Sequence, residues 1–191
     1  IAIKSTKFAE CEMVIVVNKN DKKKVEKIIS GFGRFNITEL KSSQQFPMIN
    51  DIFESGKRYC NSDDYLCYIN SDINLQYWFF DFVVDSLLIE PIDAGLVINR
   101  KDIVSDKKNV FKKNSNSESY YHPGLDCMVF PFKILNKMSF GSCTIGLPPV
   151  GNLIVTNMLQ LLPRVKLIND ALITWHRGKK EYSKWKSIEN K

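Results

Sequence analysis

The sequence lacks the residues that would mark a disulfide scaffold or a zinc site. It has five cysteines, an odd number, with no Cys-x-x-Cys pair, and only two histidines, His122 and His176. Disulfide frameworks pair an even number of cysteines, and zinc sites use closely spaced Cys or His ligands. Cys–His catalysis is disfavoured for the same shortage of partners. We therefore expect reduced thiols and a cytoplasmic protein.

Long hydrophobic runs are also missing. The apolar runs are far shorter than the roughly 20 residues that span a bilayer, and the first residues do not resemble a signal peptide. We expect no membrane span. The 27 Lys and Arg exceed the 21 Asp and Glu, for a net charge of +6, but no basic repeat studded with aromatic residues occurs. This excess suits a polyanionic ligand or an ordinary surface, and we expect no nucleic-acid partner.

The chain of 191 residues is 44% hydrophobic and 25% charged, which is typical of one globular domain. Strand-like and helix-like segments alternate along it. Alternation of this kind predicts an α/β fold, a three-layer α/β/α sandwich with a mostly parallel central sheet. Strands are expected at 1–3, 13–17, 35–40, 65–72, 95–98, 127–129 and 172–175, and helices at 20–31, 47–56, 75–88 and 151–162.

One polar stretch interrupts this alternation. Residues 101–124 are rich in Lys, Ser and Asn and contain no long apolar run. Loops of this length inside a compact domain are uncommon, and they are either disordered or binding lids. We therefore expect a flexible loop at 101–124 and leave both readings open.

The apolar run from Tyr65 to Ile69 stops abruptly at Asn70-Ser71-Asp72. In open α/β sheets ligands bind beyond the carboxyl ends of the strands. A carboxylate there can hold a divalent cation. The alternative is that Asp72 caps the following helix, whose apolar residues fall at helical spacing.

Two other segments carry candidate chemistry. Asp126 stands between a glycine turn and a short apolar strand, where it can act as a general base or contact sugar hydroxyls; alternatively, it is a turn aspartate that bonds its own backbone. His176 leaves a buried strand and precedes Gly178, Lys179 and Lys180. It can bind a metal while the lysines bind phosphate, or the segment is a solvated basic tail.

Together, the order of these motifs resembles the GT-A glycosyltransferases, which transfer a sugar from a nucleotide diphosphate donor. The resemblance covers residues 1 to about 180 and extends to a branch of small GT-A domains, including one that glycosylates the capsid of large algal viruses. It implies a single GT-A-type catalytic domain at 1–191, a viral enzyme in the host cytoplasm, and allows a domain cut from a longer polypeptide. The family motif is usually Asp-x-Asp, so Asn70 replaces its first carboxylate.

The resemblance also implies a role for each motif residue. Asp72 and His176 would bind Mn²⁺ or Mg²⁺, and Asp126 would be the catalytic carboxylate. Asn70, with Ser71 beside it, would approach the donor's ribose, or the metal through water. The base would lie near Lys4, Ser5 and Thr6, and the diphosphate would be reached by Lys179 or Lys180.

The function implied is metal-dependent transfer from a UDP-sugar donor to a glycan or glycoprotein acceptor. Two alternatives remain. A sugar-nucleotide nucleotidyltransferase would need a glycine-rich loop after the first strand, and residues 4–12 contain no glycine. A non-catalytic nucleotide- or carbohydrate-binding module of the same fold would be consistent with the amide at Asn70.

Overall fold

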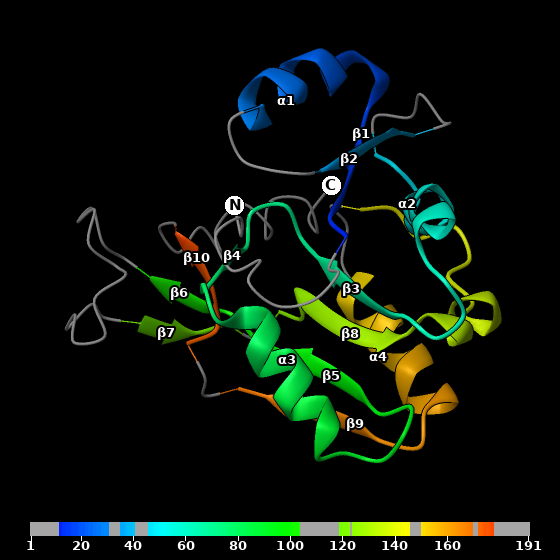
Figure 1. The fold of residues 1–191 in the computed structure, drawn as a ribbon, viewed down its shortest axis with the longest axis vertical. Coiled ribbons are helices and arrows are strands. Elements are labelled where there is room, and N and C mark those ends of the chain that lie inside the picture. The colour runs from blue at the N-terminus through cyan, green and yellow to red at the C-terminus, as the bar shows by residue number, and fades with distance from the viewer. Residues whose placement is uncertain are drawn as a thin grey trace, which may run out of the picture.

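The computed structural model describes residues 12–30, 35–40, 46–103, 119–122, 124–145, 150–169 and 172–177. Its central sheet has the strand order β3-β8-β5-β9 (Figure 1). These strands are β3 (Tyr65–Ile69), β8 (Cys127–Pro131), β5 (Gly95–Ile98) and β9 (Val165–Ile168). β8 runs antiparallel to β3 and to β5, whereas β5 and β9 are parallel. The sheet is mixed, and the predicted mostly parallel arrangement is not confirmed.

The direction of β8 follows from how the chain leaves β5. After β5 come β6 (Lys101–Ile103) and β7 (Ser119–Tyr121), which pair antiparallel. A parallel return would need a crossover, usually a helix, and the described residues between β5 and β8 contain none. The chain therefore re-enters the sheet at the end where β5 left it. These strands also correct the prediction of a loop at 101–124 at both of its ends; residues 104–118 lie outside the described residues.

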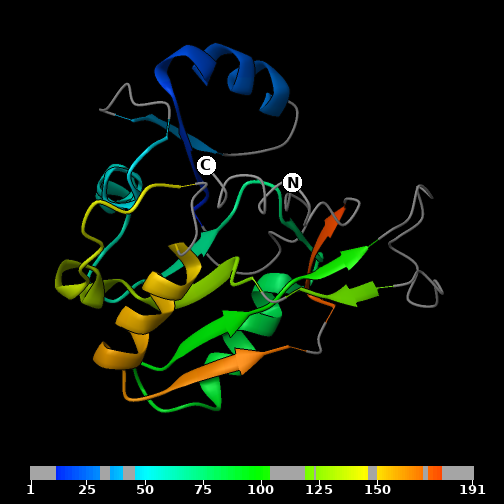
Figure 2. The same ribbon diagram turned by 180° about the vertical axis from the view of Figure 1, so that it is seen from behind.

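Helices cover both faces of the central sheet. α3 (Phe79–Leu88) packs on one face, where its Phe79 meets Leu96 of β5. α4 (Val150–Leu161) and α2 (Ile49–Gly56) pack on the other, where Val97 of β5 points. Figures 1 and 2 show α3 and α4 on opposite sides of the sheet. Successive residues of β5 therefore contribute to two apolar layers, one on each face of the sheet, as expected for a strand that is buried on both faces.

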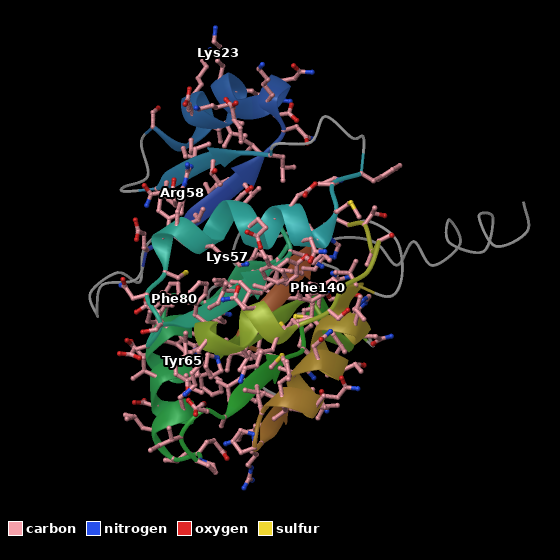
Figure 3. The ribbon with its side chains drawn as sticks, turned by 90° about the vertical axis from the view of Figure 1, so that its right-hand side faces the viewer. Lys23, Lys57, Arg58, Tyr65, Phe80 and Phe140 are labelled. Carbon is pink, nitrogen blue, oxygen red and sulfur yellow. The ribbon has the colours of Figure 1, made fainter. Side chains whose placement is uncertain are left out.

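α2 adds an aromatic cluster to one of these layers. Its Phe53 stacks on Phe140, with the ring centroids 5.1 Å apart, and contacts Tyr68 of β3 at 5.7 Å. Figure 3 shows Phe140 close to α2. The predicted helix at 47–56 is confirmed, although it begins two residues later, at Ile49. Short 3-10 helices lie at Lys19–Asp21, Lys57–Tyr59 and Phe132–Lys137.

The N-terminal part of the described chain forms a small parallel pair of strands, β1 (Val14–Val17) and β2 (Asn36–Glu39), joined by α1 (Lys22–Ile29). The predicted helix at 20–31 occurs as α1, but none of the residues of α1 is buried and Ile28 is 55% exposed. A two-stranded sheet offers a helix little surface to cover. The strand predicted at 1–3 lies outside the described residues.

A second four-stranded sheet has the order β4-β10-β6-β7. It is completed by β4 (Asn74–Leu75) and β10 (Thr174–Arg177). Leu75 therefore pairs with Thr174 in a strand, and the helix predicted to start there starts at Phe79. Among the described residues, no helix has the length and apolar character needed to cross a membrane.

Candidate functional site

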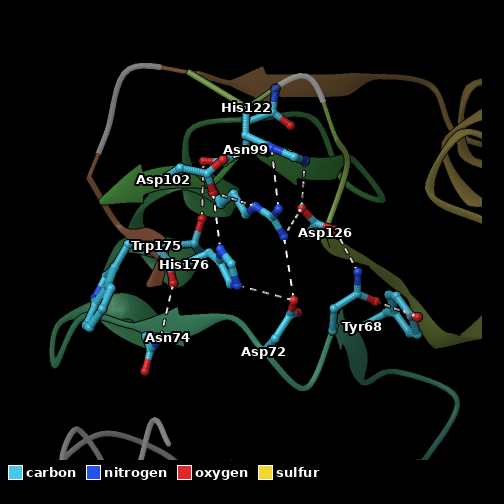
Figure 4. A network of polar contacts seen from close by, with 12 residues as sticks. Tyr68, Asp72, Asn74, Asn99, Asp102, His122, Asp126, Trp175 and His176 are labelled. Atoms are coloured by element: carbon cyan, nitrogen blue, oxygen red, sulfur yellow. Dashed lines mark hydrogen bonds and ion pairs between the residues drawn. The ribbon is translucent and has the colours of Figure 1, made fainter. Parts of the chain in front are cut away.

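Strand ends from both larger sheets meet at one place (Figure 4). The antiparallel register sets Ile69, the last residue of β3, opposite Cys127, the first of β8. The Asn70 backbone N–H consequently donates to the Asp126 carbonyl at 3.1 Å. Arg100 follows the end of β5, and His176 of β10 lies opposite Asp102 of β6. Side chains that are distant in the sequence are thereby brought together at the edge of the central sheet.

Arg100 is the electrostatic centre of this cluster. Its Nε lies 3.1 Å from Asp102 Oδ1, and its Nη1 lies 3.1 Å from Asp126 Oδ2 and 3.9 Å from Asp72 Oδ2. The side chains of Arg100, Asp102 and Asp126 are each about nine-tenths buried, whereas that of Asp72 is 55% exposed. A guanidinium with several donors is suited to hold more than one carboxylate.

Asp102 lies between the two histidines. Its Oδ2 is 3.0 Å from His122 Nδ1, and its Oδ1 is 3.4 Å from His176 Nδ1. The other ring nitrogen of His176, Nε2, faces Asp72 Oδ2 at 3.7 Å. A buried carboxylate behind an imidazole fixes the ring orientation. Asp102 therefore directs the Nε2 side of His176 toward Asp72.

A second chain of contacts reaches Asp126 from β3. The Tyr68 hydroxyl donates to Asn70 Oδ1 at 2.8 Å, and Asn70 Nδ2 donates to Asp126 Oδ1 at 2.6 Å. Burial raises the pKa of the Tyr68 phenol far above its ordinary value, and the negative charge of Asp126 adds to the shift. The phenol therefore stays protonated and donates. Asp126 is held by side chains from other strands, which is not how a turn aspartate bonds its own backbone.

Asp72 lies in a β-turn that follows β3. The turn is closed by the bond from the Ile73 N–H to the Asn70 carbonyl, at 3.1 Å. It presents the Asp72 carboxylate to solvent and leaves Ser71 exposed. The alternative role of Asp72 as a helix cap is wrong, because the N-cap of α3 is Trp78.

The structure therefore brings together Asp72, His176, Asn70 and Asp126, four of the residues predicted from the sequence. Five others lie outside the described residues: Lys4, Ser5, Thr6, Lys179 and Lys180.

Sequence reasoning missed three members of the cluster: Arg100, Asp102 and His122. Arg100 and Asp102 follow directly after the strand at 95–98, so the strand-end rule that selected Asp72 would have found them. His122 carried no comparable signal, since its place depends on the pairing of β7 with β6.

The donor set fits a divalent cation in part. No group of three or more His, Cys, Asp or Glu side chains suited to a metal occurs within the described parts of the chain. Asp72 and His176 supply one carboxylate and one imidazole, with Asp102 behind the imidazole. Mn²⁺ and Mg²⁺ accept such ligands and take further oxygens from substrate phosphates and water. The residues present thus fit a metal that is shared with a ligand.

Comparisons with known proteins identify the fold. No protein-family model and no curated protein matches the sequence. Among solved structures, the chain is similar to Staphylococcus aureus TarS, residues 1–349, in complex with UDP-GlcNAc, with a TM-score of 0.62 and 13% identity. The match covers 94% of this chain and 53% of the TarS chain, so this chain spans about half of that one. At this identity the similarity shows the fold alone. It supports the predicted glycosyltransferase fold but not the narrower resemblance to a viral capsid domain, and the chain has a mixed α/β, glycosyltransferase-like fold.

Proposed function

We propose that this chain is a metal-dependent glycosyltransferase domain that moves a sugar from a nucleotide diphosphate donor to a glycan or glycoprotein acceptor. The observation that supports the proposal most is the gathering of Asp72, Asp126 and His176 at one edge of a glycosyltransferase-like fold. The UDP-GlcNAc bound to TarS favours a UDP-sugar as the donor class.

The charges of the site support a requirement for a metal. Three carboxylates surround one guanidinium, which leaves a formal excess of two negative charges when both imidazoles are neutral. A diphosphate that approached this edge alone would be repelled. A divalent ion held by Asp72 and His176 would cancel this excess. When bound, it would stabilise the negative charge that develops on the leaving diphosphate.

Asp126 is the proposed catalytic carboxylate. Arg100 and Asn70 each contact one of its oxygens, so the group is fixed in orientation. A carboxylate has about four acceptor positions, so two contacts leave room for an acceptor hydroxyl or a sugar hydroxyl. Asp126 would orient the cationic sugar or accept the acceptor's proton.

Contacts to the rest of the donor remain proposals from the sequence. Lys4, Ser5 and Thr6 would lie near the base, and Lys179 and Lys180 near the diphosphate. Lysine ammonium groups suit phosphate oxygens.

The experiment is a donor-turnover assay. The protein is incubated with UDP-GlcNAc, UDP-glucose or UDP-galactose, with simple glycosides as acceptors, in Mn²⁺, Mg²⁺ or EDTA. Released UDP is quantified by anion-exchange chromatography. We expect metal-dependent UDP release that Asp72→Ala abolishes. Donor binding without release would indicate a non-catalytic module, and pyrophosphate release from a nucleoside triphosphate and a sugar phosphate would indicate a nucleotidyltransferase.

A further inference from the structure

The amide at position 70 is the point at which the sequence departs from the Asp-x-Asp pattern. In the structure this amide lies between the Tyr68 hydroxyl and the Asp126 carboxylate and is hydrogen-bonded to both. Figure 4 labels Tyr68 and Asp126, the two partners of this amide. Tyr68 and Asp126 are both buried, with 9% and 8% exposure.

This position requires a group that accepts on one side and donates on the other. Asn70 Oδ1 accepts from the Tyr68 hydroxyl, while Nδ2 donates to Asp126 Oδ1 at 2.6 Å. A carboxylate at position 70 would accept from Tyr68 but would set two carboxylate oxygens against each other. The backbone at this position is held close to Asp126, because the Asn70 N–H is bonded to the Asp126 carbonyl at 3.1 Å. The amide satisfies both neighbours, whereas an ionised carboxylate satisfies only Tyr68.

The opposite side of Asp126 is held independently. Its Oδ2 lies 3.1 Å from Arg100 Nη1 and 4.0 Å from His122 Nε2. The Asn70 amide therefore fixes one oxygen, and the guanidinium fixes the other. Together the two contacts set the plane of the carboxylate.

We infer that Asn70 is a positioning residue that acts through Asp126, and that it is not a ligand of the metal or of the donor. The inference rests on the proposed function only for the role given to Asp126. It makes a prediction opposite to that of the family pattern. Restoring the missing carboxylate with Asn70→Asp should destabilise the folded protein.

A stability cycle tests the contact without using activity. We expect Asn70→Asp to lower the Tm by about 4 °C or more. The exchanged pair Asn70→Asp with Asp126→Asn should regain most of that loss, because the carboxylate now at position 70 accepts from the amide now at position 126. The control is Asn152→Asp, the same chemical change at an exposed position of α4, which should shift the Tm by less than about 1 °C. If Asn70→Asp lowers the Tm by the same amount in the wild-type protein and in the Asp126→Asn variant, the inference is overturned.

A kinetic cycle tests the positioning role. Asn70→Ala should lower kcat about tenfold or more while the affinity for UDP and Mn²⁺ stays within about twofold. In an Asp126→Asn background the same change should have no further effect on kcat, because residues that act as one unit are not additive. The inference would be refuted if Asn70→Ala weakened UDP binding and if its effect on kcat multiplied with that of Asp126→Asn. Such a result would show that Asn70 contacts the donor. A wild-type protein without turnover would refute the proposed function instead, and the stability cycle would still decide whether Asn70 and Asp126 are coupled.

Discussion

Replacing Arg100 by Met should destabilise the protein strongly. Arg100 contacts Asp102 and Asp126 at 3.1 Å, and all three side chains are about nine-tenths buried. Methionine fills a similar volume but leaves two buried carboxylates without their cation. Removing one partner of a buried ion pair costs about 3–5 kcal/mol. For a chain of this length, a loss of that size corresponds to a Tm lower by about 10 °C.

Urea unfolding, followed by circular dichroism near neutral pH, measures this change. Arg100→Lys keeps the charge but loses the planar fork, so we expect an intermediate loss. The matched control is Lys133→Gln, which breaks the exposed pair with Asp93 at 2.7 Å; exposed pairs contribute about 0–1 kcal/mol. A loss for Arg100→Met no larger than that of the control would refute the view that this guanidinium neutralises buried carboxylates.

Three further predictions concern the site and its support. Asp126→Asn should lower turnover about a hundredfold or more while UDP affinity changes little, as separate kinetic and binding measurements would show; near-normal transfer would move the catalytic role elsewhere. Asp102→Asn should weaken Mn²⁺ binding about 10- to 100-fold in a calorimetric titration, because Asp102 lies behind His176. Gly151→Ala should destabilise by about 1–3 kcal/mol in urea unfolding, since its added Cβ would lie 2.3 Å from the Leu125 carbonyl oxygen; an unchanged midpoint would contradict the packing described for α4.

The elements of the central sheet and its helices were predictable from local pattern. The strands at 65–69 and 95–98 are apolar runs bounded by polar residues. The strand at 95–98 occurs as predicted, whereas the strand that starts at Tyr65 ends at Ile69, earlier than predicted. The helix at 151–162 was predicted within one residue at each end. The direction of β8 was not predictable. It runs antiparallel to β5 because the chain first forms the β6–β7 pair, and local sequence does not encode that pairing.

The candidate site was predictable where it obeys the strand-end rule. Asp72 follows β3, and His176 is the last residue but one of β10; the His176 Nε2 and Asp72 Oδ2 atoms lie 3.7 Å apart. The cluster also depends on groups paired across strands. Asp102 reaches His176 through the β6–β10 register, and Asn70 reaches Asp126 through the β3–β8 register. Such pairings become visible only when the strands are placed side by side, which explains why sequence reasoning gave Asn70 a donor contact and overlooked Asp102.

In the proposed function, a divalent ion held by Asp72 and His176 joins the nucleotide diphosphate to this site. Calorimetric titration of UDP into the wild-type protein, in Mn²⁺ and separately in EDTA, tests it most directly. We predict at least about tenfold tighter binding in Mn²⁺, and loss of that difference in Asp72→Ala with its Tm nearly unchanged, because the carboxylate is exposed. Equal UDP affinity in Mn²⁺ and in EDTA would show that no divalent ion joins the diphosphate to this site.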